Sequence, residues 1–113
     1  MPQLVARLPV SIAINTSLSA AVNIMGGLPA VIEMPAAWDA ANLTFQTSGD
    51  GTNYFNVYDE SGTEVTVTAD TSRRIRLEPS QWAGIQYIKI RSGTAGVPVV
   101  QTAARTLYLE VWE

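Results

Sequence analysis

Apolar and polar residues alternate along most of this 113-residue chain, and no segment has the apolar spacing of a long helix. The alternation is clear in residues 11–15, 42–46, 74–78 and 87–91, and it returns in residues 106–112. Roughly eight or nine such short strands, separated by turn residues, are typical of a β-sandwich or barrel. The sequence therefore predicts an all-β fold, an antiparallel, jelly-roll-like β-sandwich with one or two single-turn helices.

The length allows one domain with its own core, and the first ten residues differ from the rest. Residues 1–10, MPQLVARLPV, are apolar and hold two prolines, so we expect an extended N-terminal arm there. Residues 11–113 are expected to form the single β-sandwich domain. No apolar run approaches the roughly 18 residues that span a bilayer, and no membrane partner is expected.

One segment of the chain occurs twice, as EMPAAWDAANLTFQTSG from residue 33 and as EPSQWAGIQYIKIRSG from residue 78. In both copies Pro lies three residues before Trp, and a Ser-Gly pair begins ten residues after Trp. Pro favours the first position of a helix, which predicts single helical turns over residues 35–41 and 79–84. We expect each turn to carry the chain from one sheet to the other, with Trp38 and Trp82 buried at the ends of the core.

The later part of the chain carries a strand–turn–strand pattern in LTFQTSGDGTNYFNVYDESG, QYIKIRSG and TLYLEVW. This pattern, over residues 43–112, resembles galactose-binding-like, discoidin-type jelly rolls. The residues at matching positions are Ser48, Asp50, Gly51, Tyr54, Val57 and the run Tyr87–Arg91. The resemblance implies the jelly-roll topology. Family members are usually longer, with a calcium loop and sugar- or lipid-binding loops that we do not find in this sequence, so ligand binding does not carry over.

The overall composition suggests a class of protein. The chain is short, has no Cys or His, is rich in Thr, Ala and Val, and contains IEMPAAW followed by LTFQTSGDG. In these features it resembles small virion proteins of tailed phages. The resemblance implies a capsid decoration or cement protein, usually a homotrimer, that binds the major capsid protein or another virion protein. Such a protein is part of the phage particle and is in the host cytoplasm during assembly; a tail or fibre component is the alternative.

No catalytic, cofactor-binding or metal-binding residue is predicted, and we expect neither an enzyme nor a cofactor. The commonest general base and metal ligand are missing because the sequence has no His. The net charge of −3 argues against specific binding of nucleic acid. Residues 1–70 hold seven acidic side chains and one basic one, whereas residues 71–113 hold six basic and three acidic side chains. The two segments either contact each other between copies or neutralise each other within one fold.

Four basic side chains alternate with apolar ones on two predicted strands. If the apolar neighbours point inward, Arg74, Arg76, Lys89 and Arg91 point outward. On neighbouring strands these four residues would line one sheet face and could bind an acidic partner surface. The alternative is a solvated face that keeps the protein soluble. Both interpretations remain open from the sequence, and the four residues are interface candidates.

Outward aromatic residues offer two further surfaces. Tyr108 and Trp112 point outward in the last strand, and we favour a contact between subunits for both. The alternative is that the N-terminal arm of the same chain covers them. Tyr54 and Tyr58 lie near the Asp50-Gly51 turn, where they would serve a carbohydrate-binding module, which is the alternative function.

The acidic residues of the turns could also bind a cation. Asp50, with Asn53 and either Asp59 or Glu60, could supply oxygen ligands to Ca²⁺. Asp-Gly pairs are also the residues that tight turns require, and turn acids are usually solvated. We favour the turn interpretation, so no metal site is expected.

Overall fold

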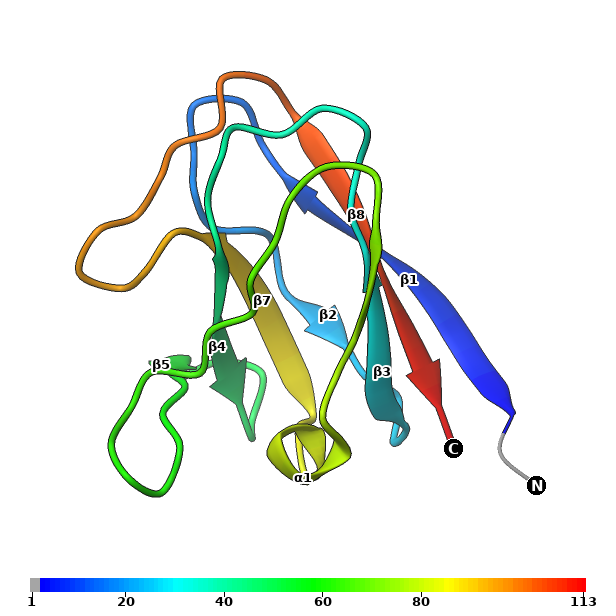
Figure 1. Cartoon of the computed structure of the whole chain (residues 1–113). Coiled ribbons are helices and arrows are strands. Elements are labelled where there is room, and N and C mark those ends of the chain that lie inside the picture. The colour runs from blue at the N-terminus through cyan, green and yellow to red at the C-terminus, as the bar shows by residue number, and fades with distance from the viewer. Residues whose placement is uncertain (1–2) are drawn as a thin grey trace.

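The computed structural model describes residues 3–113 as eight β-strands and one turn of α-helix (Figure 1). The helical turn α1 comprises Pro79–Trp82. The chain is nearly all β, as the alternation predicts. The strands are β1 (Leu4–Ile12), β2 (Val22–Asn23), β3 (Leu28–Glu33), β4 (Leu43–Ser48), β5 (Phe55–Asn56), β6 (Arg74–Arg76), β7 (Tyr87–Ser92) and β8 (Arg105–Trp112).

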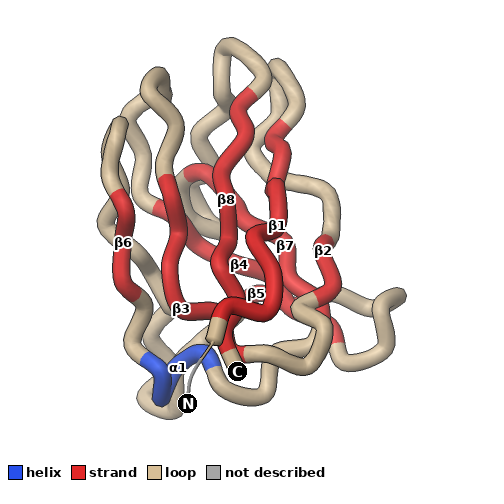
Figure 2. The backbone as a smooth tube through the Cα atoms, turned by 90° about the vertical axis from the view of Figure 1, so that its right-hand side faces the viewer, coloured by secondary structure: helices blue, strands red, loops and turns tan. Residues whose placement is uncertain are grey.

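The strands form two antiparallel sheets, and Figure 2 shows the four strands of the first sheet side by side. Sheet A has the order β1-β8-β3-β6, and sheet B has the order β2-β7-β4-β5. Strand β1 pairs with β8, β2 with β7, β3 with β6 and β4 with β5. These pairs are nested, so the chain resembles one long antiparallel hairpin that is folded into a sandwich. Pairing of β3 with β8 and of β4 with β7 completes the sheets. This arrangement is the predicted jelly roll.

The core is filled by the inward-facing side chains of alternate strand residues. In sheet B, Phe45 lies directly opposite Ile90, and in sheet A, Leu109 lies opposite both Leu8 and Ile32. The alternation therefore identified these core positions. It was wrong for Ile14, which lies beyond the end of β1 and is 55% exposed. The apolar side chains with no exposed surface are Ile12, Ile24, Ile32, Leu43, Ile88, Ile90, Leu107, Leu109 and Val111.

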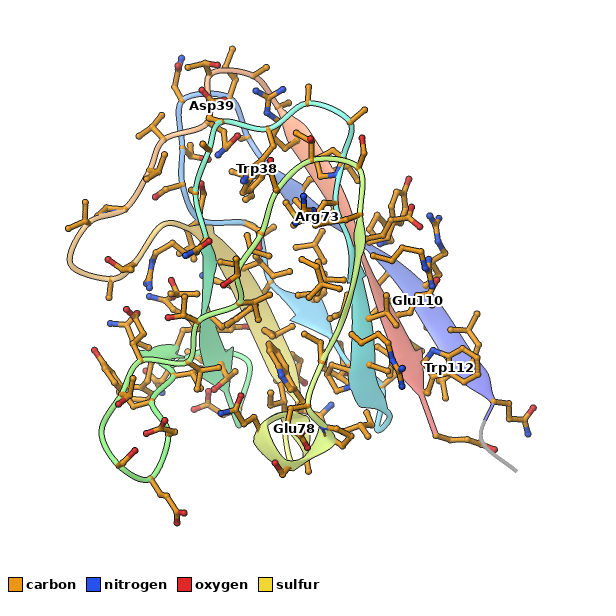
Figure 3. All side chains as sticks on the ribbon, viewed as in Figure 1. Trp38, Asp39, Arg73, Glu78, Glu110 and Trp112 are labelled. Atoms are coloured by element: carbon orange, nitrogen blue, oxygen red, sulfur yellow. The ribbon has the colours of Figure 1, made fainter. Side chains whose placement is uncertain are left out.

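Both copies of the Pro-x-x-Trp segment connect sheet A to sheet B, one between β3 and β4 and the other between β6 and β7. Trp38 is 9% exposed and Trp82 is 2% exposed, which confirms that both are buried. Trp38 lies near the top of the sandwich in Figure 3, whereas α1, which contains Trp82, lies at the bottom in Figure 1. Trp82 packs edge-on against Phe45, with 4.6 Å between the ring centroids. The repeated segment therefore places one indole toward each end of the core.

One of the two predicted helical turns forms. In α1, Pro79 lies at the start of the helix, and the Glu78 side chain caps the turn by accepting a hydrogen bond from a backbone N–H. Residues 35–41 contain no helix. There the backbone is held by a distant side chain, because the N–H and the carbonyl of Asp39 both bond to the carboxamide of Gln101.

The predicted arm over residues 1–10 is a strand of sheet A from Leu4 onward. Residues 1 and 2 lie outside the described residues. Strand β1 pairs with β8 over most of its length, in a register that places Pro9 opposite Tyr108. Proline is compatible with this strand because β1 is the edge of sheet A, where a missing N–H removes no ladder bond. Residues 4–10 therefore belong to the sandwich.

A small hairpin projects from the edge of sheet B, on the side of β4 where β5 pairs. The Asp50-Gly51 turn joins β4 to β5 as predicted, with Gly51 at a φ of +78° that favours glycine. Strand β5 pairs with one end of β4, and Val67 forms a bridge to Leu43 at the other end. Residues 58–64 leave the sheet between these two contacts, and a bridge joins their ends. We call residues 58–64 the edge hairpin.

Candidate interaction surface

The six predicted interface residues are divided between the outer faces of the two sheets. Sheet A carries Arg74, Arg76, Tyr108 and Trp112, and sheet B carries Lys89 and Arg91. Strands β6 and β7 follow each other in the sequence, but α1 carries the chain from one sheet to the other between them. The two strands are therefore not neighbours, and the four cations do not form the single stripe that neighbouring strands would have given.

Four charged side chains form a closed ring on the outer face of sheet A. Arg74 donates hydrogen bonds to Glu33 at 2.8 Å and to Glu110 at 2.7 Å, and Arg7 forms ion pairs with the same two carboxylates. The strand register explains the ring, since Glu33 lies opposite Arg74 and Glu110 lies opposite Arg7. We call these four residues the ion ring. Two positive and two negative charges give it no net charge.

The ion ring holds its charges within the chain. The hydrogen bond from Arg74, together with its positive charge, lowers the pKa of Glu110 below its ordinary value. The same hydrogen bonds to Glu110 and Glu33 raise the pKa of Arg74. Glu110 is only 7% exposed, although its side chain points to the outer face of the sheet. Arg74 is therefore already paired by residues of its own chain.

The two outward aromatic residues of β8 have different surroundings. Tyr108 is half-buried, and the Arg7 guanidinium lies 3.8 Å from the centre of its ring. Strand β1 thus covers Tyr108, which is the arrangement that we considered as the alternative to a subunit contact. Trp112 lies at the far end of β8, near the C-terminus in Figure 3, in register with Leu4 of β1 and Leu28 of β3.

An apolar patch lies at this end of sheet A, where β1 begins beside the end of β8 (Figure 1). It consists of Leu4, Val5, Trp112 and Leu28, the last of which also packs against the core, and we call it the terminal patch. Leu4 is 46% exposed and Val5 is 42% exposed, while the other two side chains are half-buried. Within residues 3–113 the outer edge of β1 has no partner strand, so backbone groups beside the patch are open to pairing. Sequence reasoning found Trp112 but assigned Leu4 and Val5 to an arm.

The outer face of sheet B buries its arginine. Arg91 is 7% exposed and donates hydrogen bonds to Asn56 at 2.6 Å, to Thr44 at 3.2 Å and to Glu64 at 3.4 Å. Glu64 also accepts a hydrogen bond from the backbone N–H of Ala95 at 3.1 Å. The guanidinium therefore joins β4, β5 and the edge hairpin, and Glu64 extends the network to the connection after β7.

The acidic first segment and the basic second segment of the chain neutralise each other within the fold, which is one of the two arrangements expected. Lys89 lies over the ring of Tyr54, with 4.4 Å between its ammonium nitrogen and the ring centre. Each of four other basic residues forms an ion pair with an acidic residue of the first segment. The pairs are Arg73 with Asp70, Arg74 with Glu33, Arg91 with Glu64, and Arg105 with Asp39.

The turn acids use their oxygen atoms within their own turns. Asp50 accepts hydrogen bonds from the backbone N–H groups of Asn53 and Thr52, both at 2.8 Å, and these bonds lower its pKa. Hydrogen bonds from Ser61 lower the pKa of Asp59 in the same way. Across residues 3–113, no group of three or more His, Cys, Asp or Glu side chains is placed to hold a metal ion. The turn interpretation fits these contacts.

The surfaces described here can act by non-covalent contact. The terminal patch offers apolar area and an open strand edge, and the ion ring offers polar groups without net charge. In the described part of the chain no helix is both long enough and apolar enough to cross a bilayer. A comparison with protein-family models, curated proteins and solved structures finds no match to this chain.

Proposed function

We propose that this chain is a non-enzymatic structural protein of a virus particle, a decoration or cement protein that binds the capsid surface. Its main support is the terminal patch beside the open edge of β1. Exposed aliphatic side chains next to a half-buried Trp and an unpaired strand edge are features of surfaces that bind other proteins. The resemblance of the sequence to small virion proteins of tailed phages supports the same function.

The proposed mechanism is adhesive. Apolar area at the centre of a contact contributes roughly 25 cal/mol for each Å² removed from water. The ion ring borders the terminal patch, since Glu110 and Trp112 both face outward on β8, and it would form a polar rim. Because the ring has no net charge, burying part of it leaves no unpaired ion. Contacts of this kind with several capsid subunits would raise the free energy needed to separate them.

The open edge of β1 beside the terminal patch suits contact between copies of the chain, and we propose a homotrimer. The start of β1 and the end of β8 lie at one end of sheet A (Figure 1). Three copies arranged around an axis at this end would place their terminal patches on one face of the trimer, where they can contact the capsid together. The outer edge of β1 would then be covered by a neighbour, which removes the risk of uncontrolled strand pairing.

The test combines light scattering after size-exclusion chromatography with co-sedimentation of the protein and capsids of the virus whose genome encodes it. We expect a trimer that sediments with the capsids. The double variant Leu4→Lys/Val5→Lys places two charges in the terminal patch and should be monomeric or lose capsid binding. Ile14→Lys is the matched control, because Ile14 is 55% exposed and lies beyond the opposite end of β1.

Three results would contradict the proposal. The first is a monomer that does not sediment with capsids. The second is a patch variant that assembles and binds as the unchanged protein does. The third is a gene that lies outside any set of virion genes, which the neighbouring genes show without purified protein.

A further inference from the structure

A cleft of about 560 Å³ lies between the edge hairpin and α1. Tyr58, Asp59 and Ser61 form the hairpin wall, and Ser80 and Gln81 form the wall on α1. Figure 1 shows the edge hairpin and α1 at the same end of the sandwich. The volume is within the range of about 300–1,000 Å³ that is usual for small-molecule sites. This cleft is separate from the terminal patch and the ion ring.

Both walls of the cleft are held by their own hydrogen bonds. Oδ1 of Asp59 accepts hydrogen bonds from the Ser61 hydroxyl at 2.8 Å, from the Ser61 N–H at 2.9 Å and from the Thr63 N–H at 3.0 Å. On the other side, Glu78 caps α1, and the ring of Pro79 fixes φ of the first residue of this helical turn. A ligand would therefore meet walls that are already ordered, which lowers the entropy cost of binding.

The polar groups of the cleft select the charge of its ligand. Its lining includes two carboxylates, those of Asp59 and Glu60, and no basic side chain. An anionic ligand such as a phosphate or a sialylated sugar would be repelled. The Ser61 and Ser80 hydroxyls and the Gln81 carboxamide both donate and accept hydrogen bonds. A neutral ligand that presents many hydroxyl groups matches this set.

The apolar groups of the cleft suit the carbon face of a sugar ring. Tyr58 is 53% exposed, so one ring is available for stacking, while Val57 and Val65 line the cleft beside it. Tyr54, the other aromatic residue considered for carbohydrate binding, lies beneath Lys89 and does not line this cleft. We infer that the cleft binds a neutral saccharide unit, and this inference does not rest on the proposed virion function.

The experiment measures binding of the labelled full-length chain to an array of neutral and sialylated glycans, followed by titration of the best neutral glycan. Tyr58→Ala should weaken binding about tenfold or more, as expected for loss of a stacked ring. Gln81→Ala, on the opposite wall, should weaken it as well. Phe55→Ala is the matched control, because Phe55 is 71% exposed and lies on β5 outside the cleft. It should bind as the unchanged protein does.

The substituted side chains are exposed, so the variants should keep the fold, which equal melting temperatures would show. Several outcomes would overturn the inference. They are no neutral glycan bound at millimolar concentration, a preference for sialylated glycans, and equal loss of binding in Tyr58→Ala and Phe55→Ala. Failure here leaves the capsid proposal unaffected, since that proposal depends on the terminal patch.

Discussion

The outer faces of sheet A and sheet B carry similar sequence patterns in different surroundings. Each has two outward basic residues at alternate positions, Arg74 and Arg76 on β6 and Lys89 and Arg91 on β7. On sheet A the Arg74 side chain pairs with two carboxylates and stays 50% exposed. On sheet B the Arg91 side chain is 8% exposed. The same alternation thus produces a surface ion ring on one face and a buried arginine on the other.

The difference arises from what lies above each face. The partners of Arg74 are side chains of the same face, Glu33 on the neighbouring strand β3 and Glu110 on β8, the strand beyond it. Over Arg91 lie the edge hairpin and the connection after β7, joined by the hydrogen bond from Ala95 to Glu64. Burial of an outward strand residue therefore depends on whether a long connection folds back over its sheet. Substitutions in the core and on the two faces test this difference.

Substitutions in the core between the two sheets should have the largest effect on stability. Trp82→Ala should lower the free energy of unfolding by about 3–5 kcal/mol, because it removes a buried indole and its contact with Phe45. Trp38→Ala should fall in the same range, at its lower end, since Trp38 is slightly more exposed. Urea unfolding at neutral pH measures both values. A loss under about 1 kcal/mol for either variant would show that its indole does not close the core.

On sheet B, Arg91→Ala should lower the free energy of unfolding by about 3 kcal/mol, because it leaves Glu64 without its buried cation. Arg76→Ala is the matched control on sheet A. Arg76 is exposed, and its removal should change stability by about 0.5 kcal/mol or less. Equal losses in the two variants, by the same urea unfolding, would remove the proposed difference between the faces.

The features that the sequence predicted depend on local patterns. The Asp50-Gly51 turn, the alternation in β4 and β7, and the burial of Trp38 and Trp82 each follow from a few neighbouring residues. The β-sandwich followed from the number and spacing of such strands, and the jelly-roll topology was implied by the resemblance. The N-terminal strand was missed because the two prolines of residues 1–10 were taken to indicate an arm, although an edge strand tolerates proline.

The candidate surfaces depend on pairing between distant strands, which local patterns do not contain. Arg74 bonds to Glu33, 41 residues away, and to Glu110, 36 residues away. The terminal patch likewise joins the first strand to the last. The outward direction of Arg74 and Trp112 was predictable, and their neighbours across the sheet were not. The register of strand pairing is therefore the information that the sequence reasoning lacked.

A substitution in the ion ring on sheet A should have the smallest effect on the free energy of unfolding, and this effect should depend on pH. Arg74 holds the pKa of Glu110 below its ordinary value of 4.5. A carboxyl with a lowered pKa in the folded state stabilises the protein above the ordinary value, and this stabilisation is lost as the pH falls through the folded-state pKa. Arg74→Ala should therefore lower the free energy of unfolding at pH 7, and the difference from the unchanged protein should shrink below pH 4.5.

Urea unfolding of Arg74→Ala and of Arg76→Ala at pH 7, 5 and 3 separates the ion ring from a general effect of lost positive charge. Arg76 lies on the same strand and carries the same charge, but it is not part of the ion ring. Its removal should shift stability by an amount that does not follow the titration of Glu110. The loss of unfolding free energy in Arg74→Ala, relative to the unchanged protein, should shrink toward pH 3. A loss that stays constant or grows would show that the charged form of Glu110 is not stabilised by Arg74. High salt should also reduce the difference, because Arg74 is half-exposed and its charge is screened, whereas the buried pair of Arg91 on sheet B should be affected less.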